Sequence, residues 1–259
     1  WSVIGSMEDL DAASLEDVQD WFKTYYGPNN AVLALAGDID LETAKEKVNK
    51  FFGDIPAGPP LVKPDIWIAK RSEEKRDLMF DNVPQARIYK SWNVPPRDTE
   101  AAAHFDLASS VLVGGKNSPL YKELVYEKQI ATNVSAFYYD REIAGMFFLI
   151  ADVVAGEDPA TVEKAMDDVI NSFIKKGPNR KLLQAEKTKA VAGFIRGIQR
   201  IGGFGGKSDL LATCQTYTGN PGCYRDTAKY LDEVTPAKMK ATFAQWIDDT
   251  AYVLTILPN

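Results

Sequence analysis

The sequence predicts an α+β fold with a mixed, largely antiparallel sheet and helices packed on one face. The C-terminal part of a similar domain is expected to precede it in the chain. Three observations predict this organisation. Residues 131–140 and 144–154 are apolar runs joined by a short polar turn, as in a β-hairpin. Segments with helical spacing of apolar residues follow over 159–247. Finally, residues 14–38 and 235–259 match in pattern at a constant offset of 221, which indicates a duplicated architecture.

The first copy of this repeat lies near the start of the chain. Residues 14–26 predict a helix, because apolar residues recur at helical spacing and Ser14 with Asp17 resembles a capping box. The residues on its apolar face are Val18, Trp21, Phe22 and Tyr25. A turn leads into the apolar run 31–38, a predicted buried strand, and residues 41–52 predict a second helix. Since little precedes this copy, we expect the chain to begin inside a domain whose body is missing.

A proline-rich stretch separates this copy from the rest. Residues 54–64 contain four prolines and predict an extended linker. We therefore expect residues 1–56 to be the C-terminal helix-strand-helix portion of a truncated first domain. Residues 57–74 are the expected linker, and residues 75–259 a complete second domain of the same fold.

The second domain is expected to alternate strands and helices along the chain. Strands are predicted at residues 77–81, 85–93, 131–140, 144–154 and 251–257. Helices are predicted at residues 98–113, 118–129, 159–176, 180–200, 205–218, 221–231 and 235–247. Strands that pair mainly antiparallel, with helices on one side, form a two-layer α+β sandwich.

Composition excludes some functional classes. The chain has 259 residues, 45% of them hydrophobic and 25% charged, which is ordinary for a globular protein. A formal charge of −6 argues against nucleic acid as a partner. The longest strongly apolar stretch, residues 146–151, is too short for a membrane span, and the first residues do not resemble a signal peptide.

The cysteines and the histidine limit the possible chemistry. Cys214 and Cys223 flank an Asn-Pro-Gly turn and form either a disulfide or two buried thiols, which we leave open. The single histidine, His104, has apolar neighbours in a predicted helix, so we interpret it as a packed helix residue. One histidine excludes a two-histidine zinc site within this chain, and no nucleophile elbow accompanies it.

Two adjacent features are candidates for substrate binding. Glycines at positions 202, 203, 205 and 206 resemble a phosphate loop, but Ile201 stands where the P-loop needs glycine, so a nucleotide site is improbable. A helix break is the favoured interpretation, and a loop that lines a substrate cavity is the alternative. Residues 175–207 carry nine Lys and Arg against one acid, and could steer an acidic polypeptide even if most are simply solvated. The candidate contact residues are Gly203, Gly205, Gly206, Lys189, Arg196 and Arg200.

Two sequence blocks resemble a known family. Tyr25–Asp38 has the form Y-Y-x-P-N-N-x-x-L-x-L-x-G-D, and Gly114–Leu124 the form G-G-x-x-S-x-L-Y-x-x-L. Both resemble segments that follow the active site in the pitrilysin family of zinc metallopeptidases, which includes the mitochondrial processing peptidase. The resemblance covers essentially the whole chain.

The resemblance implies where catalysis resides. Family members contain repeated α+β domains, and two halves enclose a peptide chamber; an inverted H-x-x-E-H motif and a further Glu bind zinc in the first domain. This motif does not occur in the sequence, so no catalytic or metal-binding role transfers to any residue here. Zinc is therefore expected upstream in the parent protein, and the chain alone should be inactive. The implied partners are a peptide substrate, the upstream catalytic domain, and a second homologous half or subunit.

One block departs from the family. Non-catalytic halves carry an Arg/Tyr pair in a block of form L-R-x-x-x-Q-x-x-Y, and Val125 and Thr132 occupy those places here. This favours the second domain of a zinc-bearing half. The leading hypothesis is the C-terminal, non-catalytic part of a zinc metalloendopeptidase. The alternative is a catalytically inactive processing-peptidase-like subunit or scaffold. A third, weaker hypothesis is a hydrolase that acts through His104.

The remaining expectations concern the substrate and the compartment. The basic stretch predicts a preference for acidic or extended peptides. A disulfide between the two cysteines would favour the bacterial periplasm or cell envelope.

Overall fold

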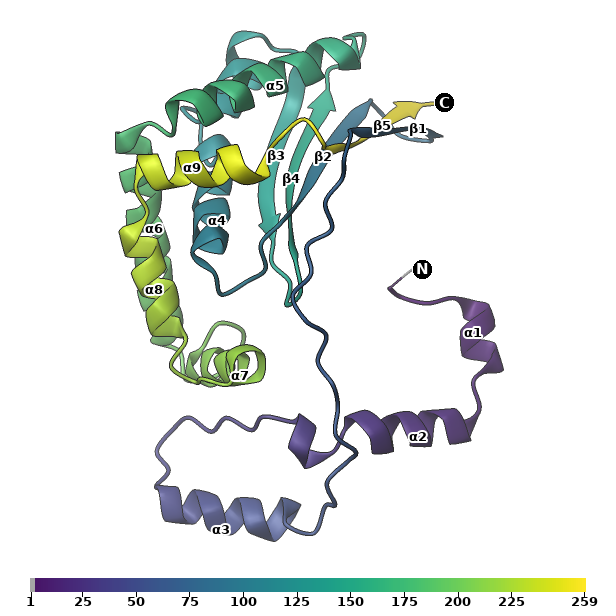
Figure 1. Cartoon of the computed structure of the whole chain (residues 1–259), viewed down its shortest axis with the longest axis vertical. Coiled ribbons are helices and arrows are strands. Elements are labelled where there is room, and N and C mark those ends of the chain that lie inside the picture. Colours follow the sequence, from purple (N-terminus) through teal and green to yellow (C-terminus); the bar gives the residue numbers. More distant parts are fainter. Residues whose placement is uncertain (1–2) are drawn as a thin grey trace. The chain divides into compact units, whose positions relative to one another are not determined.

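The computed structural model describes residues 3–259, and this part of the chain divides into two compact units (Figure 1). The first unit contains the chain up to Pro64 together with Gly197–Gly222. The second contains Asp65–Arg196 and Cys223–Asn259. The boundary at Pro64 falls inside the expected linker, while the three domain ranges proposed from the sequence stay a prediction.

The second unit is built on a five-stranded sheet with strand order β1-β5-β2-β4-β3. Its strands are β1 (Lys75–Asp81), β2 (Arg87–Val94), β3 (Ala131–Tyr139), β4 (Gly145–Val153) and β5 (Tyr252–Pro258). Strands β1 and β5 pair in parallel, and all other neighbours pair antiparallel. The predicted α+β class with a mixed, largely antiparallel sheet is therefore confirmed.

Helices cover one face of this sheet. On β4, Phe147 and Leu149 are fully buried, whereas their neighbours Phe148 and Ile150 are only partly covered. This alternation is expected of a strand with one face against the core. Figure 1 shows α4, α5 and α9 on the covered side. The helical segments of this unit are α4 (Glu100–Val113), η2 (Tyr121–Glu127), α5 (Pro159–Lys176), α6 (Arg180–Ile198), α8 (Tyr224–Glu233) and α9 (Pro236–Trp246).

The centre of the core is aromatic. The ring centroid of Phe105 on α4 lies 5.3 Å from Phe147 and 5.1 Å from Phe243 on α9. Phe173 on α5 meets Phe243 edge-on at 4.9 Å. These rings are almost completely buried, so they join α4, α5 and α9 to the sheet.

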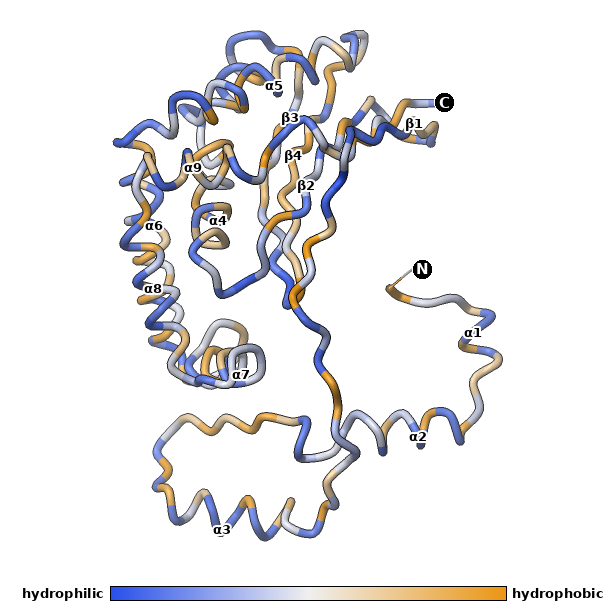
Figure 2. The backbone as a smooth tube through the Cα atoms, viewed as in Figure 1, coloured by the Kyte–Doolittle hydropathy of each residue, from blue (hydrophilic) through white to orange (hydrophobic). Residues whose placement is uncertain are grey.

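The first unit is mostly helical. It contains α1 (Met7–Ala12), α2 (Leu15–Tyr25), the short η1 (Pro28–Asn30), α3 (Leu41–Phe52) and α7 (Lys207–Thr218). The predicted capping box is present, with Ser14 and Asp17 exchanging side-chain-to-backbone hydrogen bonds of 3.1 and 2.8 Å. Hydrophobic and hydrophilic residues alternate along α2 and α3, yet neither helix contains a buried residue (Figure 2).

The Pro-Asn-Asn turn of the first block joins distant parts of this unit. The side-chain amide of Asn29 donates to the Gly58 carbonyl at 3.1 Å and accepts from the Gly58 amide at 2.8 Å. A side chain at Gly27 would collide with the Gly58 backbone, so glycine is required for this close approach. The Tyr25–Asp38 block thus holds the start of the linker against the end of α2.

Two expectations differ in detail from the structure, and one helix was not expected. Residues 31–38 form no strand, because a strand needs a hydrogen-bonded neighbour and no described segment pairs with them. The helix expected at 118–129 is π-helical over Tyr121–Glu127, with the Lys128 amide bonding the Glu123 carbonyl. Helix α1 was not expected, although Ser6 caps it through the Asp9 amide.

Candidate functional site

The glycine-rich segment at 201–206 forms a closed, hydrogen-bonded loop. The Lys207 amide donates to the Arg200 carbonyl, and the Ser208 amide to the Ile201 carbonyl, at 3.0 and 3.1 Å. The Arg200 guanidinium also binds the Phe204 carbonyl at 2.8 Å. Gly203 and Gly205 have φ of 77° and 73°, in the left-handed region that favours glycine.

This loop presents an aromatic side chain to solvent. Phe204 is 94% exposed, although its backbone is held by Arg200 on one side. On the other side, the Gly205 amide donates to the Asp209 carboxylate at 2.8 Å. The backbone of the loop is thus held in place while the hydrophobic side chain of Phe204 is left open to contact with a partner.

The basic candidates do not lie on one continuous helix. Lys189 and Arg196 are on α6, but the helix ends at Ile198, so Arg200 belongs to the loop. Lys189 binds the buried carboxylate of Glu186 at 2.7 Å. The remaining candidate, Gly206, is the N-cap of α7, so the segment is also the helix break that the sequence favours.

The single histidine lies in the packing between α4 and α9. Its Nδ1 lies 2.6 Å from the Thr242 hydroxyl, and its Nε2 is buried without a hydrogen-bond partner. Burial lowers the pKa of His104. Because the side chain is only 3% exposed, the structure places His104 where the sequence predicts a packed helix residue.

The two cysteines are both buried. Cys214 lies on α7 and Cys223 immediately precedes α8, with 2% and 8% of their surfaces exposed. Neither is a free cysteine in the structure. The bridge between them stays a prediction.

The positions of the family's Arg/Tyr pair have structural roles here. Val125 lies on η2 and packs against the core. The Thr132 hydroxyl on β3 accepts from the Gln85 amide at 2.6 Å and donates to the Asp152 carbonyl at 3.3 Å. Neither side chain offers the charged or phenolic group of the family pair.

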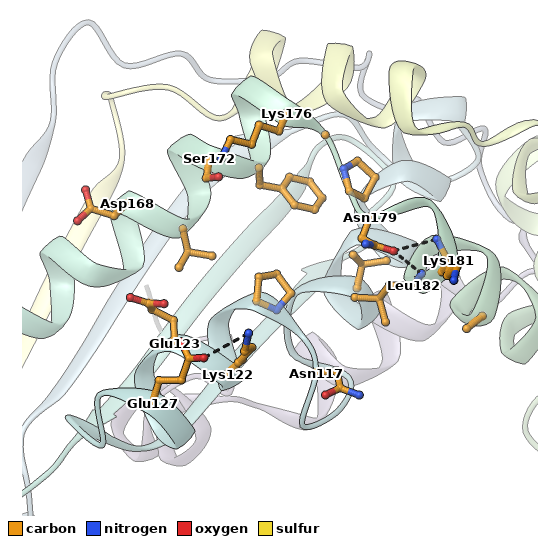
Figure 3. Close-up of a pocket in the computed structure, with 17 residues that line it drawn as sticks. Asn117, Lys122, Glu123, Glu127, Asp168, Ser172, Lys176, Asn179, Lys181 and Leu182 are labelled. Atoms are coloured by element: carbon orange, nitrogen blue, oxygen red, sulfur yellow. Dashed lines mark hydrogen bonds and ion pairs between the residues drawn. The ribbon is translucent and has the colours of Figure 1, made fainter.

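A further candidate site is a cavity that the sequence does not indicate. It has a volume of about 760 Å³, within the usual range of ligand pockets. Figure 3 shows Asp168, Ser172 and Lys176 of α5 along one side, with side chains of η2 across from them. Asn179 and Leu182, at the start of α6, lie at one end.

The helix junction that shapes this end follows from local sequence. Gly177 ends α5 with φ of 75°, and its amide bonds the Phe173 carbonyl. Asn179 then caps α6, because its side-chain oxygen accepts from the amides of Lys181 and Leu182 at 2.9 and 3.2 Å. Both helix limits were predictable, but the cavity also needs η2 across from them, which no local pattern specifies.

The acidic side chains of the cavity are all paired. Asp168 binds Lys164 at 2.8 Å, Glu123 binds Lys128 at 2.9 Å, and Glu127 binds Lys122 at 3.2 Å. Lys176 and Lys181 form no ion pair among the described residues. The cavity therefore has surplus positive charge at the end where α5 meets α6.

Within residues 3–259, no three or more His, Cys, Asp or Glu side chains are grouped so that they could hold a metal ion. The described residues therefore do not fit a zinc site, and no catalytic step is assigned to them. None of the helices in the same range combines the length and apolarity that crossing a bilayer requires.

Comparison with known proteins agrees with the blocks noted in the sequence. Residues 12–190 match the family described as Peptidase M16 inactive domain. The chain is 25% identical over 195 residues to "Zinc protease PqqE" of Helicobacter pylori, a match covering 73% of this chain and 42% of that protein. It is 26% identical over 265 residues to "Presequence protease, mitochondrial" of Mus musculus, covering 90% of this chain and 25% of that protein.

A solved structure shows the same fold. The crystal structure of a peptidase M16 inactive domain from Pseudomonas fluorescens superposes with a TM-score of 0.81 at 18% identity. The match covers 100% of this chain and 60% of that one. The chain thus spans less than half the length of the two curated relatives, and about three fifths of this solved structure.

Proposed function

Because the chain belongs to the family of M16 peptidase inactive domains, we propose that it is the non-catalytic part of a zinc-dependent metalloendopeptidase. The zinc ligands and the catalytic glutamate belong to another domain of the parent protein, and a second homologous half or subunit completes the peptide chamber. The observation that carries the proposal is the family match over residues 12–190, in a chain whose one histidine is packed between α4 and α9.

Zinc analysis and a peptide-cleavage assay test this proposal. The purified chain should bind no stoichiometric zinc and should not cleave peptides. The same assays on the product of the complete gene should detect both properties. Tight stoichiometric zinc or intrinsic cleavage in the isolated chain would overturn the proposal. A complete gene without H-x-x-E-H would favour the inactive subunit or scaffold instead.

The contribution of this domain is contact with peptide substrate. The supporting features are the exposed Phe204, the loop glycines Gly203, Gly205 and Gly206, and three cations that lie close to them in the sequence. The cations in question are Lys189, Arg196 and Arg200. Hydrophobic and cationic groups together suit an acidic or extended peptide. Phe204→Ser should weaken substrate binding by the complete enzyme without changing its zinc content, whereas an unchanged KM would remove the loop from the site.

We further infer a bridge between Cys214 and Cys223, and with it an oxidising compartment such as the bacterial periplasm or envelope. Relatives in Helicobacter and Pseudomonas fit a bacterial source. Mass spectrometry after alkylation in denaturant tests the bridge. Two alkyl groups should add only after reduction, and alkylation of the unreduced chain would contradict it.

A further inference from the structure

The cavity between η2, α5 and α6 combines a hydrophobic floor with unpaired positive charge. Val169, Phe173 and Leu182 supply apolar surface, and Phe173 joins this floor to the core through Phe243. Lys176, the last residue of α5, and Lys181, in the first turn of α6, have exposed side chains on its rim. A site of this kind suits a ligand that is both apolar and anionic.

The charge pattern favours an anionic group at one end of the cavity, and in a polypeptide ligand that group is a carboxylate. The three acids of the cavity are already bound by lysines, so they add little repulsion toward an incoming anion. The start of α6 lies at the same end as the two unpaired lysines, and its partial positive charge adds to theirs. Favourable potential and apolar contact area therefore coincide at one end of the cavity.

We propose that this cavity binds an acidic segment of the polypeptide substrate, with an apolar side chain on Val169, Phe173 and Leu182 and flanking Asp or Glu carboxylates on Lys176 and Lys181. The inference rests on the proposed function for its class of ligand. None of residues 201–206 lines this cavity.

Fluorescence anisotropy with labelled peptides tests the proposal on the whole chain. The probe is a short blocked peptide in which leucine is flanked by aspartates and glutamates, and its control replaces the acids by asparagine and glutamine. The acidic peptide should bind about tenfold more tightly than the amide control, and its affinity should fall as salt rises. Equal affinity of the two peptides, or an affinity insensitive to salt, would overturn the proposal.

Substitutions at the rim lysines test whether the acidic peptide binds in the cavity. The double variant Lys176→Glu with Lys181→Glu should weaken binding of the acidic peptide by about tenfold or more. Lys175→Glu is the matched control, because Lys175 is exposed one residue before Lys176 but does not line the cavity. The affinity of the Lys175→Glu variant for the acidic peptide should stay within about twofold of that of the parent chain. Equal losses from the control and the double variant would reveal non-specific attraction and overturn the proposal.

A substitution that fills the cavity tests whether the peptide binds against its apolar side. Ala185 lines the cavity but is exposed on α6, so Ala185→Trp should occupy the space without disturbing the core. It should abolish binding of the acidic peptide while circular dichroism and thermal unfolding stay unchanged. Undiminished binding to this folded variant would overturn the cavity as the site.

The outcomes separate this inference from the proposed function. If Lys189→Glu and Arg196→Glu abolish binding and the rim variants do not, the cavity assignment fails while substrate contact through Lys189 and Arg196 stands. If only a neutral peptide with a free C-terminal carboxylate binds, the commitment to acidic side chains fails. Zinc analysis and cleavage by the complete enzyme remain independent of all these measurements.

Discussion

Lys90 is a buried cation on β2, only 4% exposed, and its ammonium is held by acids of α5. Its Nζ lies 3.1 Å from Glu163 and 2.6 Å from Asp167. Glu163 also accepts hydrogen bonds from the Arg76 guanidinium on β1. Burial would raise the pKa of Glu163, but the bonds from Arg76 and the charge of Lys90 lower it overall. One carboxylate thus joins two strands to α5.

Removing the negative charge of Glu163 should destabilise the fold. Glu163→Gln leaves Lys90 and Arg76 with too little counter-charge, so we expect a loss of about 2–4 kcal/mol in the free energy of unfolding at neutral pH. Because the folded state lowers the pKa of Glu163, its contribution is full above the ordinary value of 4.5 and is lost as pH falls through the folded value. Urea unfolding across this pH range should show the two proteins converging in acid. Glu233→Gln, in an exposed pair, should cost under about 0.5 kcal/mol, and an equal cost would contradict the account.

His104 predicts a second pH effect, centred nearer neutrality. Burial lowers its pKa below 6.5; the neighbouring Glu100 opposes this shift and Lys238 adds to it. The unfolded chain therefore takes up the proton first, and stability should fall as pH drops below about 6.5. Urea unfolding from neutral pH downward measures this slope. In His104→Gln, which can still bond Thr242, the slope should flatten; an unchanged slope would assign it to other groups.

For individual residues, the sequence predicted part of what the structure shows. The apolar neighbours of His104 predicted its packed position. Lys90 was missed, although Ile88, Lys90 and Trp92 alternate along one strand and so share its core face. That periodicity was a usable signal for a buried lysine. Its acidic partners were not predictable, because Glu163 and Asp167 reach it only when α5 packs on the sheet.

Glycines within elements give a paired prediction. Gly145 begins β4, where an added Cβ would collide with the Tyr138 ring and the Pro95 carbonyl. Gly193 lies inside α6, and nothing lies within 4 Å of the Cβ that alanine would add there. Gly145→Ala should destabilise by about 1–3 kcal/mol, whereas Gly193→Ala should stabilise by about 0.5–1 kcal/mol. Thermal unfolding of both variants compares them directly, and shifts of the same sign would contradict this reading of the local geometry.

The two copies of the repeat show what limits prediction of elements. Residues 251–257 and 31–38 have similar apolar patterns, and both were predicted as strands. The former is strand β5, which lies between β1 and β2 and is hydrogen-bonded on both sides. The latter has no pairing partner among the described residues and is not a strand. Local pattern predicts extended backbone, but a strand depends on non-local pairing. The π-helical geometry of η2 likewise leaves no mark in the apolar periodicity.

At the scale of the whole molecule, burial is concentrated in the second unit. The core joins the sheet to α4, α5 and α9, whereas α2 and α3 contribute no buried residue. Trp21 and Phe51 are 58% and 67% exposed, so the apolar faces of both helices are open to solvent in the described chain. The fold class was predictable because the hairpin and the amphipathic helices are local features of the sequence. The division into compact units was harder to predict from the sequence, because Gly197–Gly222 groups with residues far away in the chain.

This distribution predicts that the first 64 residues are dispensable for the sheet. A protease should cut first at residues 54–64, which are mostly extended and outside any sheet. The fragment 65–259 should then unfold cooperatively, with a Tm within a few degrees of the whole chain, because it keeps the aromatic core and all five strands. It should also bind less of a hydrophobic dye, since α2 and α3 carry much of the exposed apolar surface. Far-UV circular dichroism and dye fluorescence of both proteins measure these effects. A fragment that loses cooperative unfolding would mean that residues before 65 stabilise the sheet in a way their exposure does not indicate.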